Sequence, residues 1–191
     1  MKEKIALTIV LLWPIIPIFW IILHGIPKLV KRIKFFIYPL VFLIFIGIAY
    51  ILLKNKSFLF STKIHLQYFL NICGYLIFFS GLILHTWTLL LLTLPGITGV
   101  PEIKNDKNFS LITKGPFSIV RHPTYLAHTM IFLGAFLFTQ YTILLIITFL
   151  DFLLVNLIII PLEEKELTKR MGEKYIQYQK KVRWKFIPFI F

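Results

Sequence analysis

Five apolar runs constrain this chain more than any other feature. They cover residues 5–23, 35–53, 64–94, 124–139 and 142–160, and about 20 apolar residues suffice for a helix to cross the hydrocarbon core of a bilayer. With 58% hydrophobic and 15% charged residues, the chain has too little polar surface to cover a water-soluble globule. We therefore predict an all-α integral membrane protein with about five transmembrane helices.

Local signals refine these spans. Lys2 and Lys4 precede the first run as in a secretory signal, but the run is too long for one and carries Pro14 and Pro17, and no small-residue cleavage site follows. We therefore expect a retained helix that bends at its prolines, as membrane helices tolerate. The last two runs are separated only at residues 140–141, which predicts a tight helical hairpin.

The 21 lysines and arginines are unequally divided between the two sides of a five-span protein. Five lie on one side: Lys2, Lys4, Lys54, Lys56 and Lys63. The other sixteen are Lys28, Lys31, Arg32, Lys34, Lys104, Lys107, Lys114, Arg121 and the basic residues of the tail from Lys165 to Lys185. The positive-inside rule then places the loop at residues 95–121 and the C-terminus in the cytoplasm. This explains the net charge of +13 without nucleic acid, and the basic tail suits anionic headgroups.

We expect one structural domain with two unlike halves. Residues 1–94 hold three transmembrane helices with few polar side chains, whereas the polar motifs concentrate in residues 95–191. The one cysteine, Cys73, lies inside the third span, which excludes a disulfide framework and a cysteine metal site. We predict no metal centre.

The first motif, residues 109–125, leads into the fourth span. Pro123 suits the first position of a helix and disfavours helical geometry at His122, so the helix should begin at Pro123. The free N–H groups at such a helix start favour an anionic group, and Arg121 and His122 add donors beside it. Alternatively, Arg121 is a positive-inside anchor and His122 a cap at the membrane surface.

The second motif, residues 161–178, follows the fifth span. Glu163 and Glu164 should lie in the first turn of the next helix, where the helix dipole alone favours acidic residues, and Gly172 should end that helix. Glu163 is the better candidate for an inward role because it is nearest to the membrane exit. Tyr175 and Tyr178 share one helical face, which would pack at the interface or line a pocket.

Together, these motifs resemble those of the isoprenylcysteine carboxyl methyltransferase and phospholipid methyltransferase superfamily. The resemblance runs from about Glu102 to Pro188 and rests on Leu-Ile-Thr-Lys-Gly-Pro-Phe, Arg-His-Pro-Thr-Tyr, a Glu-Glu pair and Gly-Glu-Lys-Tyr-Ile-Gln-Tyr, in that order. Members are membrane-embedded and use S-adenosyl-L-methionine. The resemblance therefore implies a cytoplasmic cofactor-binding loop followed by a C-terminal helix.

The resemblance also implies which residues contact the cofactor, and we add the two tyrosines as pocket candidates. The predicted cofactor-binding set is Glu102, Phe109, Ser110, Leu111, Ile112, Phe117, His122, Pro123, Thr124, Tyr125, Glu163, Tyr175 and Tyr178. In relatives the position of Phe109 is often histidine and that of Phe117 often tyrosine. Two polar contacts would then be missing here.

Methyl transfer requires an acceptor held in line with the methyl group in a dry pocket, without a nucleophilic residue or metal. The catalytic candidates are therefore polar side chains near the motifs: Arg121, His128, Asp151 and Asn156. In an antiparallel hairpin Asp151 should lie near the level of His128, and ionisable groups in hydrocarbon are usually paired or functional. A structural pair of His128 with Asp151 and a role at the substrate site are both open. His85 is expected only to mark the interfacial end of the third span.

Ile159 is a substrate-binding candidate because it departs from the resemblance. Carboxyl methyltransferases of prenylated cysteine have an arginine four residues before the cofactor-binding glutamate, and here that position is Ile159. A carboxylate entering a dry pocket needs a paired cation, which Arg121, Lys181 or Arg183 would have to supply instead. We therefore expect a neutral or cationic acceptor, such as an amine, thiol or hydroxyl on a hydrophobic molecule.

The sequence thus predicts a multi-pass membrane enzyme that moves the methyl group of S-adenosylmethionine onto a membrane lipid or another hydrophobic small molecule. One alternative is an NADPH-dependent sterol or enone reductase of related fold, and another is a non-catalytic lipid-binding membrane protein. The cofactor that is bound discriminates between the three: S-adenosylhomocysteine, NADPH or neither.

Overall fold

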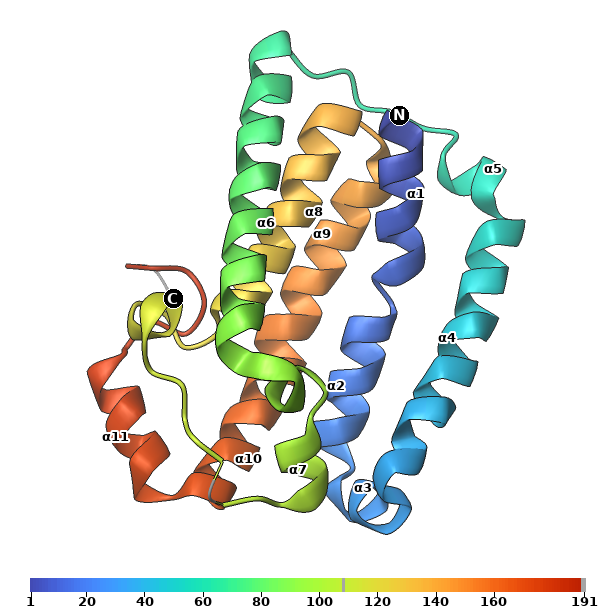
Figure 1. The fold of residues 1–191 in the computed structure, drawn as a ribbon. Helices are drawn as coiled ribbons and strands as arrows, with labels where there is room; N and C mark the ends of the chain where they lie inside the picture. The colour runs from blue at the N-terminus through green and yellow to red at the C-terminus, as the bar shows by residue number, and fades with distance from the viewer. Residues whose placement is uncertain (108, 190–191) are drawn as a thin grey trace.

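The computed structural model of the chain describes residues 1–107 and 109–189. Within this range every named element is a helix, and strand-like pairing is confined to two isolated bridges, Lys63 with Tyr141 and Val120 with Trp184. Figure 1 shows long helices side by side, with most of the shorter helices gathered at one end of the bundle. The predicted all-α membrane fold is confirmed.

The spans correspond to the apolar runs. Among the described residues, four helical segments are long and apolar enough to span a membrane: Lys2–Gly25, Pro27–Lys54, Tyr68–Lys104 and Thr142–Met171. A fifth apolar helix, α8 (Pro123–Thr139), has 17 residues, the lower end of the range for a transmembrane helix.

The first two segments are broken by prolines and by a 3₁₀ turn. α1 (Lys2–Leu12) and α2 (Ile15–Gly25) meet at Pro14, because a proline ring removes a backbone donor and displaces the preceding turn. α3 (Pro27–Ile33) and η1 (Lys34–Phe36) then lead into α4 (Ile37–Lys54), and the short α5 (Lys56–Leu59) follows. The proline bend expected in the first span is therefore present.

The closest helix pair is α6 (Tyr68–Ile97) with α8, and glycines permit the approach. A Cβ atom on Gly134 would lie 2.5 Å from the backbone nitrogen of Phe78 and 2.8 Å from the carbonyl oxygen of Gly74. Small residues at such crossings allow backbones to approach in membranes, where packing drives association. In Figure 1 the two helices run alongside each other through the bundle.

α6 kinks at Thr93, whose φ of 60° is unusual for a β-branched residue. The helix nevertheless continues through Pro95 to Ile97, two residues beyond the point where the sequence suggested that the polar loop begins. α7 (Val100–Lys104) and η2 (Gly115–Ser118) follow, and α8 begins at Pro123 with His122 just outside it, as predicted.

The fourth and fifth spans form the predicted tight hairpin. Gln140 takes a left-handed conformation with φ of 67° and separates α8 from α9 (Thr142–Leu154). The next helix, α10 (Ile160–Met171), has Pro161 at its start and Glu163 in its first turn, as expected. It is not separated from the fifth span, because α9 continues into it through a π-helical turn, η3 (Val155–Ile159). Gly172, with φ of 60°, ends α10 as expected, and α11 (Glu173–Lys181) follows.

The N-terminal half packs directly against the C-terminal half. Ala6 and Val10 of α1 belong to the same buried cluster as Phe138 of α8 and Leu144 of α9. Beyond α11, the chain turns back toward the start of α8, where the backbone N–H of His122 donates to the carbonyl of Lys185 at 2.9 Å. This return of the tail fixes the basic end of the bundle, where α7, α10 and α11 lie together (Figure 1).

We predict that Gly134→Ala destabilises the protein by about 1–3 kcal/mol, because the added methyl group overpacks a contact that consists of backbone atoms. Gly47→Ala is the matched control, since nothing lies within 4 Å of the added Cβ in α4, and alanine is the better helix former. Thermal unfolding in detergent should show a lower midpoint for the first variant only. Equal midpoints would contradict the close crossing.

Candidate functional site

A cavity with about 870 Å³ of empty space, part of it open to the surroundings, lies at the end of the bundle where the two motifs meet. Every residue of the predicted cofactor-binding set lines it except Pro123. Arg121 and His128, two of the predicted catalytic residues, also line it.

Arg121 is buried in the wall of this cavity and binds two chain segments, α10 and the tail after α11. Its Nε donates to Oε1 of Glu164 at 2.6 Å, and its Nη1 donates to the carbonyl oxygens of Val182 and Arg183, each at 2.8 Å. The side chain is 6% exposed. The guanidinium is thus committed to the fold and is not a surface anchor.

His122 lies between the two glutamates of the second motif. Its Nε2 is 3.3 Å from Oε1 of Glu164, and its Nδ1 is 3.6 Å from Oε2 of Glu163. The Tyr125 hydroxyl donates to the same Glu163 oxygen at 2.8 Å. Of the two carboxylates only Glu163 lines the cavity. Glu164 instead forms the buried ion pair with Arg121.

A second buried arginine, Arg170, was missed by the sequence reasoning, which counted it among the topology charges. Its Nη2 donates to Glu102 at 2.7 Å, its Nε donates to Glu166 at 2.6 Å, and its Nη1 donates to the carbonyl of Asp106 at 3.2 Å. The i, i+4 spacing of Glu166 and Arg170 was the available signal. This network holds Glu102 in the cavity wall.

Tyr175 and Tyr178 bring α11 to the cavity. The Tyr178 hydroxyl donates to the carbonyl of Phe117 at 2.7 Å and thereby fixes the loop that carries the first motif. Burial raises the pKa of both tyrosines well above the usual value, because a phenolate loses its hydration there. Both side chains are therefore neutral hydrogen-bonding groups.

Several polar atoms in the cavity wall have no hydrogen-bond partner among the described residues. They are Oε2 of Glu102, Oγ1 of Thr124, Nδ1 of His128 and the Tyr175 hydroxyl. Buried polar groups are normally satisfied, and each exception calls for an explanation. A polar ligand in this cavity would provide the missing partners.

A second, apolar cavity adjoins the first within the membrane-spanning helices. It holds about 1430 Å³ of empty space, again partly open to the surroundings, and is lined from α2, α4, α6 and α8. Four residues line both cavities: Trp20, Leu92, Thr124 and His128. Trp20 comes from the first span, where the sequence gave no signal for it.

Three predicted site residues lie elsewhere. Asp151 accepts a hydrogen bond from the Trp13 indole at 2.9 Å, and the Asn156 amide donates to the carbonyl of Phe152 at 2.8 Å. Ile159 is fully buried in a cluster with Val155 and Phe186. None of the three is among the residues that line either cavity.

The predicted pairing of His128 with Asp151 is therefore replaced by two other contacts. The first span supplies Trp13 to Asp151, and α6 supplies His85, whose ring centroid lies 4.6 Å from that of His128. His85 thus faces the bundle interior rather than only marking the end of its span.

A family model described as phospholipid methyltransferase matches residues 69–174 of the chain. The chain belongs to this family. The match begins in α6 and includes both buried arginines and the Glu163–Glu164 pair, so this phospholipid methyltransferase family member has its matched region around the first cavity. Searches of curated proteins and of solved structures found no match.

We predict that Glu164→Ala lowers the free energy of unfolding by about 3 kcal/mol, because it leaves the buried Arg121 guanidinium without its anion. Glu163→Ala should cost only about 1 kcal/mol, since it removes one hydrogen bond from Tyr125. Thermal unfolding of the two variants provides the comparison. If Glu163→Ala were the more damaging change, the division of roles between the two carboxylates would be wrong.

Proposed function

We propose that this member of the phospholipid methyltransferase family binds S-adenosylmethionine in the first cavity and methylates a hydrophobic, lipid-like acceptor that occupies the second. The observation that carries the proposal is the junction of the two cavities at Trp20, Leu92, Thr124 and His128. A cavity that carries the two sequence motifs and the carboxylates of Glu102 and Glu163 thus adjoins a second cavity whose described lining has no acidic or basic side chains other than histidine. This arrangement suits a polar cofactor and a membrane-borne acceptor that meet at one point.

The first cavity fits the cofactor by its donor and acceptor groups. Bound there, the cofactor supplies a methyl group activated on a sulfonium sulfur. Glu163 and the unpartnered oxygen of Glu102 suit the amino group and the ribose hydroxyls, whereas Phe109, Leu111 and Phe117 suit an adenine ring. Arg121 acts through Glu164 and the tail carbonyls, and we therefore assign it a positioning role instead of the catalytic one.

The chemistry of the second cavity supports an acceptor without a carboxylate. Its described lining contains hydrophobic residues, Thr98, Thr124 and two histidines, but no lysine or arginine. An anionic headgroup would lack the paired cation that a low-dielectric site requires. Ile159 is buried and carries no charge, so it supplies no cation either. We therefore propose a neutral or cationic reacting group and assign Ile159 to packing.

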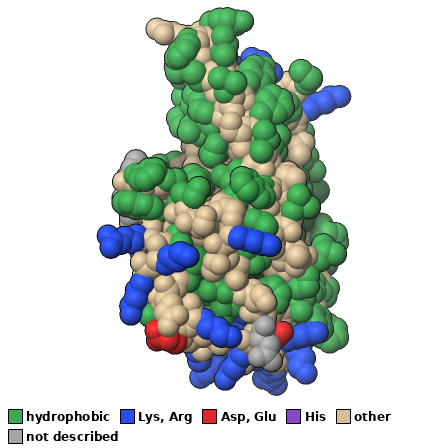
Figure 2. Space-filling model, turned by 60° about the vertical axis from the view of Figure 1, so that its left-hand side comes forward, with side chains coloured by type: hydrophobic (Ala, Val, Ile, Leu, Met, Phe, Trp, Pro, Cys, Tyr) green, Lys and Arg blue, Asp and Glu red, His purple; other side chains and the backbone are tan. Residues whose placement is uncertain are grey.

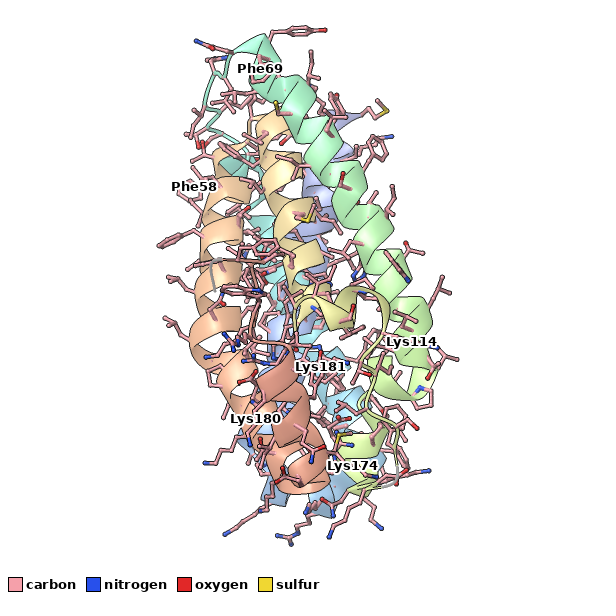
Figure 3. The ribbon with its side chains drawn as sticks, turned by 90° about the vertical axis from the view of Figure 1, so that its left-hand side faces the viewer. Phe58, Phe69, Lys114, Lys174, Lys180 and Lys181 are labelled. Atoms are coloured by element: carbon pink, nitrogen blue, oxygen red, sulfur yellow. The ribbon has the colours of Figure 1, made fainter. Side chains whose placement is uncertain are left out.

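The charge distribution supports a cytoplasmic site. The basic residues gather at the end of the bundle that carries α3, α7, α10 and α11, and Figure 2 shows this concentration of Lys and Arg side chains. Lys114, Lys174, Lys180 and Lys181 extend from that half in Figure 3, whereas Phe58 and Phe69 lie toward the opposite end. By the positive-inside rule, that half and the C-terminus face the cytoplasm, where S-adenosylmethionine is available.

We predict that Glu163→Gln weakens S-adenosylhomocysteine binding about 10-fold or more, because a charge-assisted contact to the ligand is lost. His122→Ala and Tyr125→Phe, which disturb the position of Glu163, should also weaken binding. Calorimetry in detergent is the measurement, with Glu173→Gln as the matched control because Glu173 is exposed on α11 and does not line the cavity.

Unchanged affinity in all three variants would contradict the proposed cofactor site. Binding of NADPH in place of S-adenosylhomocysteine would favour a reductase. If the protein bound neither of them, a non-catalytic lipid-binding protein would be favoured.

We predict the orientation from cysteine labelling of intact cells in a Cys73→Ser background. A cysteine at Gln179 of the basic tail should resist a membrane-impermeant thiol reagent until the membrane is opened. A cysteine at the exposed Ser57, near the opposite end, should react at once. The reverse pattern would place the site outside the cytoplasm.

A further inference from the structure

His128 of α8, which is buried, and His85 of α6, which is half-buried, form a histidine pair beside the junction of the two cavities. Their ring centroids are 4.6 Å apart, and His128 is 8% exposed. His128 lines both cavities and His85 lines the apolar one. The pair therefore borders the place where, under the proposed function, the reacting group of the acceptor meets the cofactor.

The fold itself does not use the hydrogen-bonding capacity of this pair. Nδ1 of each ring is enclosed without a partner among the described residues, and so is Oγ1 of the adjacent Thr124. A histidine that is buried for structure alone normally has its ring nitrogens satisfied. An unpaired imidazole in a cavity wall is instead free to interact with a ligand.

The groups that face the pair leave it available as a proton acceptor. From α8, Tyr125 and Phe132 lie against His128 with ring centroids 6.3 Å and 6.2 Å away, and His85 is the facing titratable group from α6. The nearby carboxylates are engaged elsewhere, Asp151 with Trp13 and Glu163 with Tyr125.

We propose that His128, with His85 beside it, takes up the proton that the acceptor loses on methylation, so that the site selects a thiol, hydroxyl or amine on an apolar body. This inference rests on the proposed function. The acceptor's lone pair forms the bond to the methyl carbon as the bond between that carbon and the sulfonium sulfur breaks. The electron pair of the broken bond remains on sulfur, and the proton of the acceptor passes to an imidazole nitrogen. One positive charge thus moves from the sulfonium to the histidine pair.

The two imidazoles have different tasks. His128 reaches the junction and touches the acceptor, whereas His85 acts through His128 and stabilises the imidazolium by sharing its charge. A carboxylate acceptor has no proton to lose and gains nothing from such a pair. The histidines and the uncharged lining of the apolar cavity therefore favour the same class of acceptor.

Methylation of 1-dodecanethiol, dodecylamine and a total membrane lipid extract with methyl-labelled S-adenosylmethionine tests the inference. His128→Gln should lower kcat about 100-fold at neutral pH, the size expected for loss of a general base. With 1-dodecanethiol as acceptor, the difference in kcat between His128→Gln and wild type should become smaller at alkaline pH, because a thiolate needs no base. His85→Gln should lower kcat by a smaller factor. His65→Gln is the matched control because His65 is exposed in a loop.

A second measurement does not depend on activity. In protein with ¹³C-labelled histidine rings, 1-dodecanethiol should shift the signals of His85 and His128, assigned by substitution, but not that of His65. S-adenosylhomocysteine affinity should remain within about 3-fold of wild type in His85→Gln, because His85 lines only the apolar cavity.

A His128→Gln deficit that is constant with pH, a wild-type rate in that variant, or unshifted His85 and His128 signals would overturn the inference. So would a wild-type protein that binds S-adenosylhomocysteine but methylates none of the three acceptors, and this result would leave the cofactor proposal intact. Failure to bind S-adenosylhomocysteine would instead overturn the proposed function itself.

Discussion

The geometry of the site depends on the hydrogen bonds and the ion pair of the buried Arg121 guanidinium. It joins the start of α8 to Glu164 of α10 and to two carbonyls of the tail. An isolated charge at this depth is very costly, so these partners must remain together. Their arrangement orients the neighbouring Glu163 toward the cavity and keeps His122 between the two carboxylates. The same charge that signals membrane orientation in the sequence therefore acts as a structural tie.

Features that depend on local chain properties could be predicted from the sequence. The length of the apolar runs predicted the spans, and the effect of Pro123 on the backbone of His122 predicted the start of α8. The short polar break at Gln140 gave the hairpin, and Gly172 gave the end of α10. The ordered motifs also predicted most of the lining of the first cavity, although not Trp20, Leu92 or Arg170.

Side-chain pairing across helices could not be predicted in the same way. It depends on the rotation and register of each helix, which the π-helical turn in η3 changes within the fifth span. Asp151 contacts Trp13 of the first span, and His128 contacts His85 of the third span, where the sequence predicted only an interfacial residue. Arg170 was hidden for another reason. A basic tail looks alike in sequence whether its members face water or a buried carboxylate.

The return of the tail to the start of α8 also sets the order in which the site is completed during synthesis. The helices from α1 to α9 contain the apolar contacts that their insertion requires, but Arg121 lacks its carbonyl partners until the segment around Arg183 has been made. The bridge between Val120 and Trp184 likewise joins residues far apart in the chain. A nascent chain thus acquires its membrane architecture first, and the contacts that hold the wall of the first cavity form last.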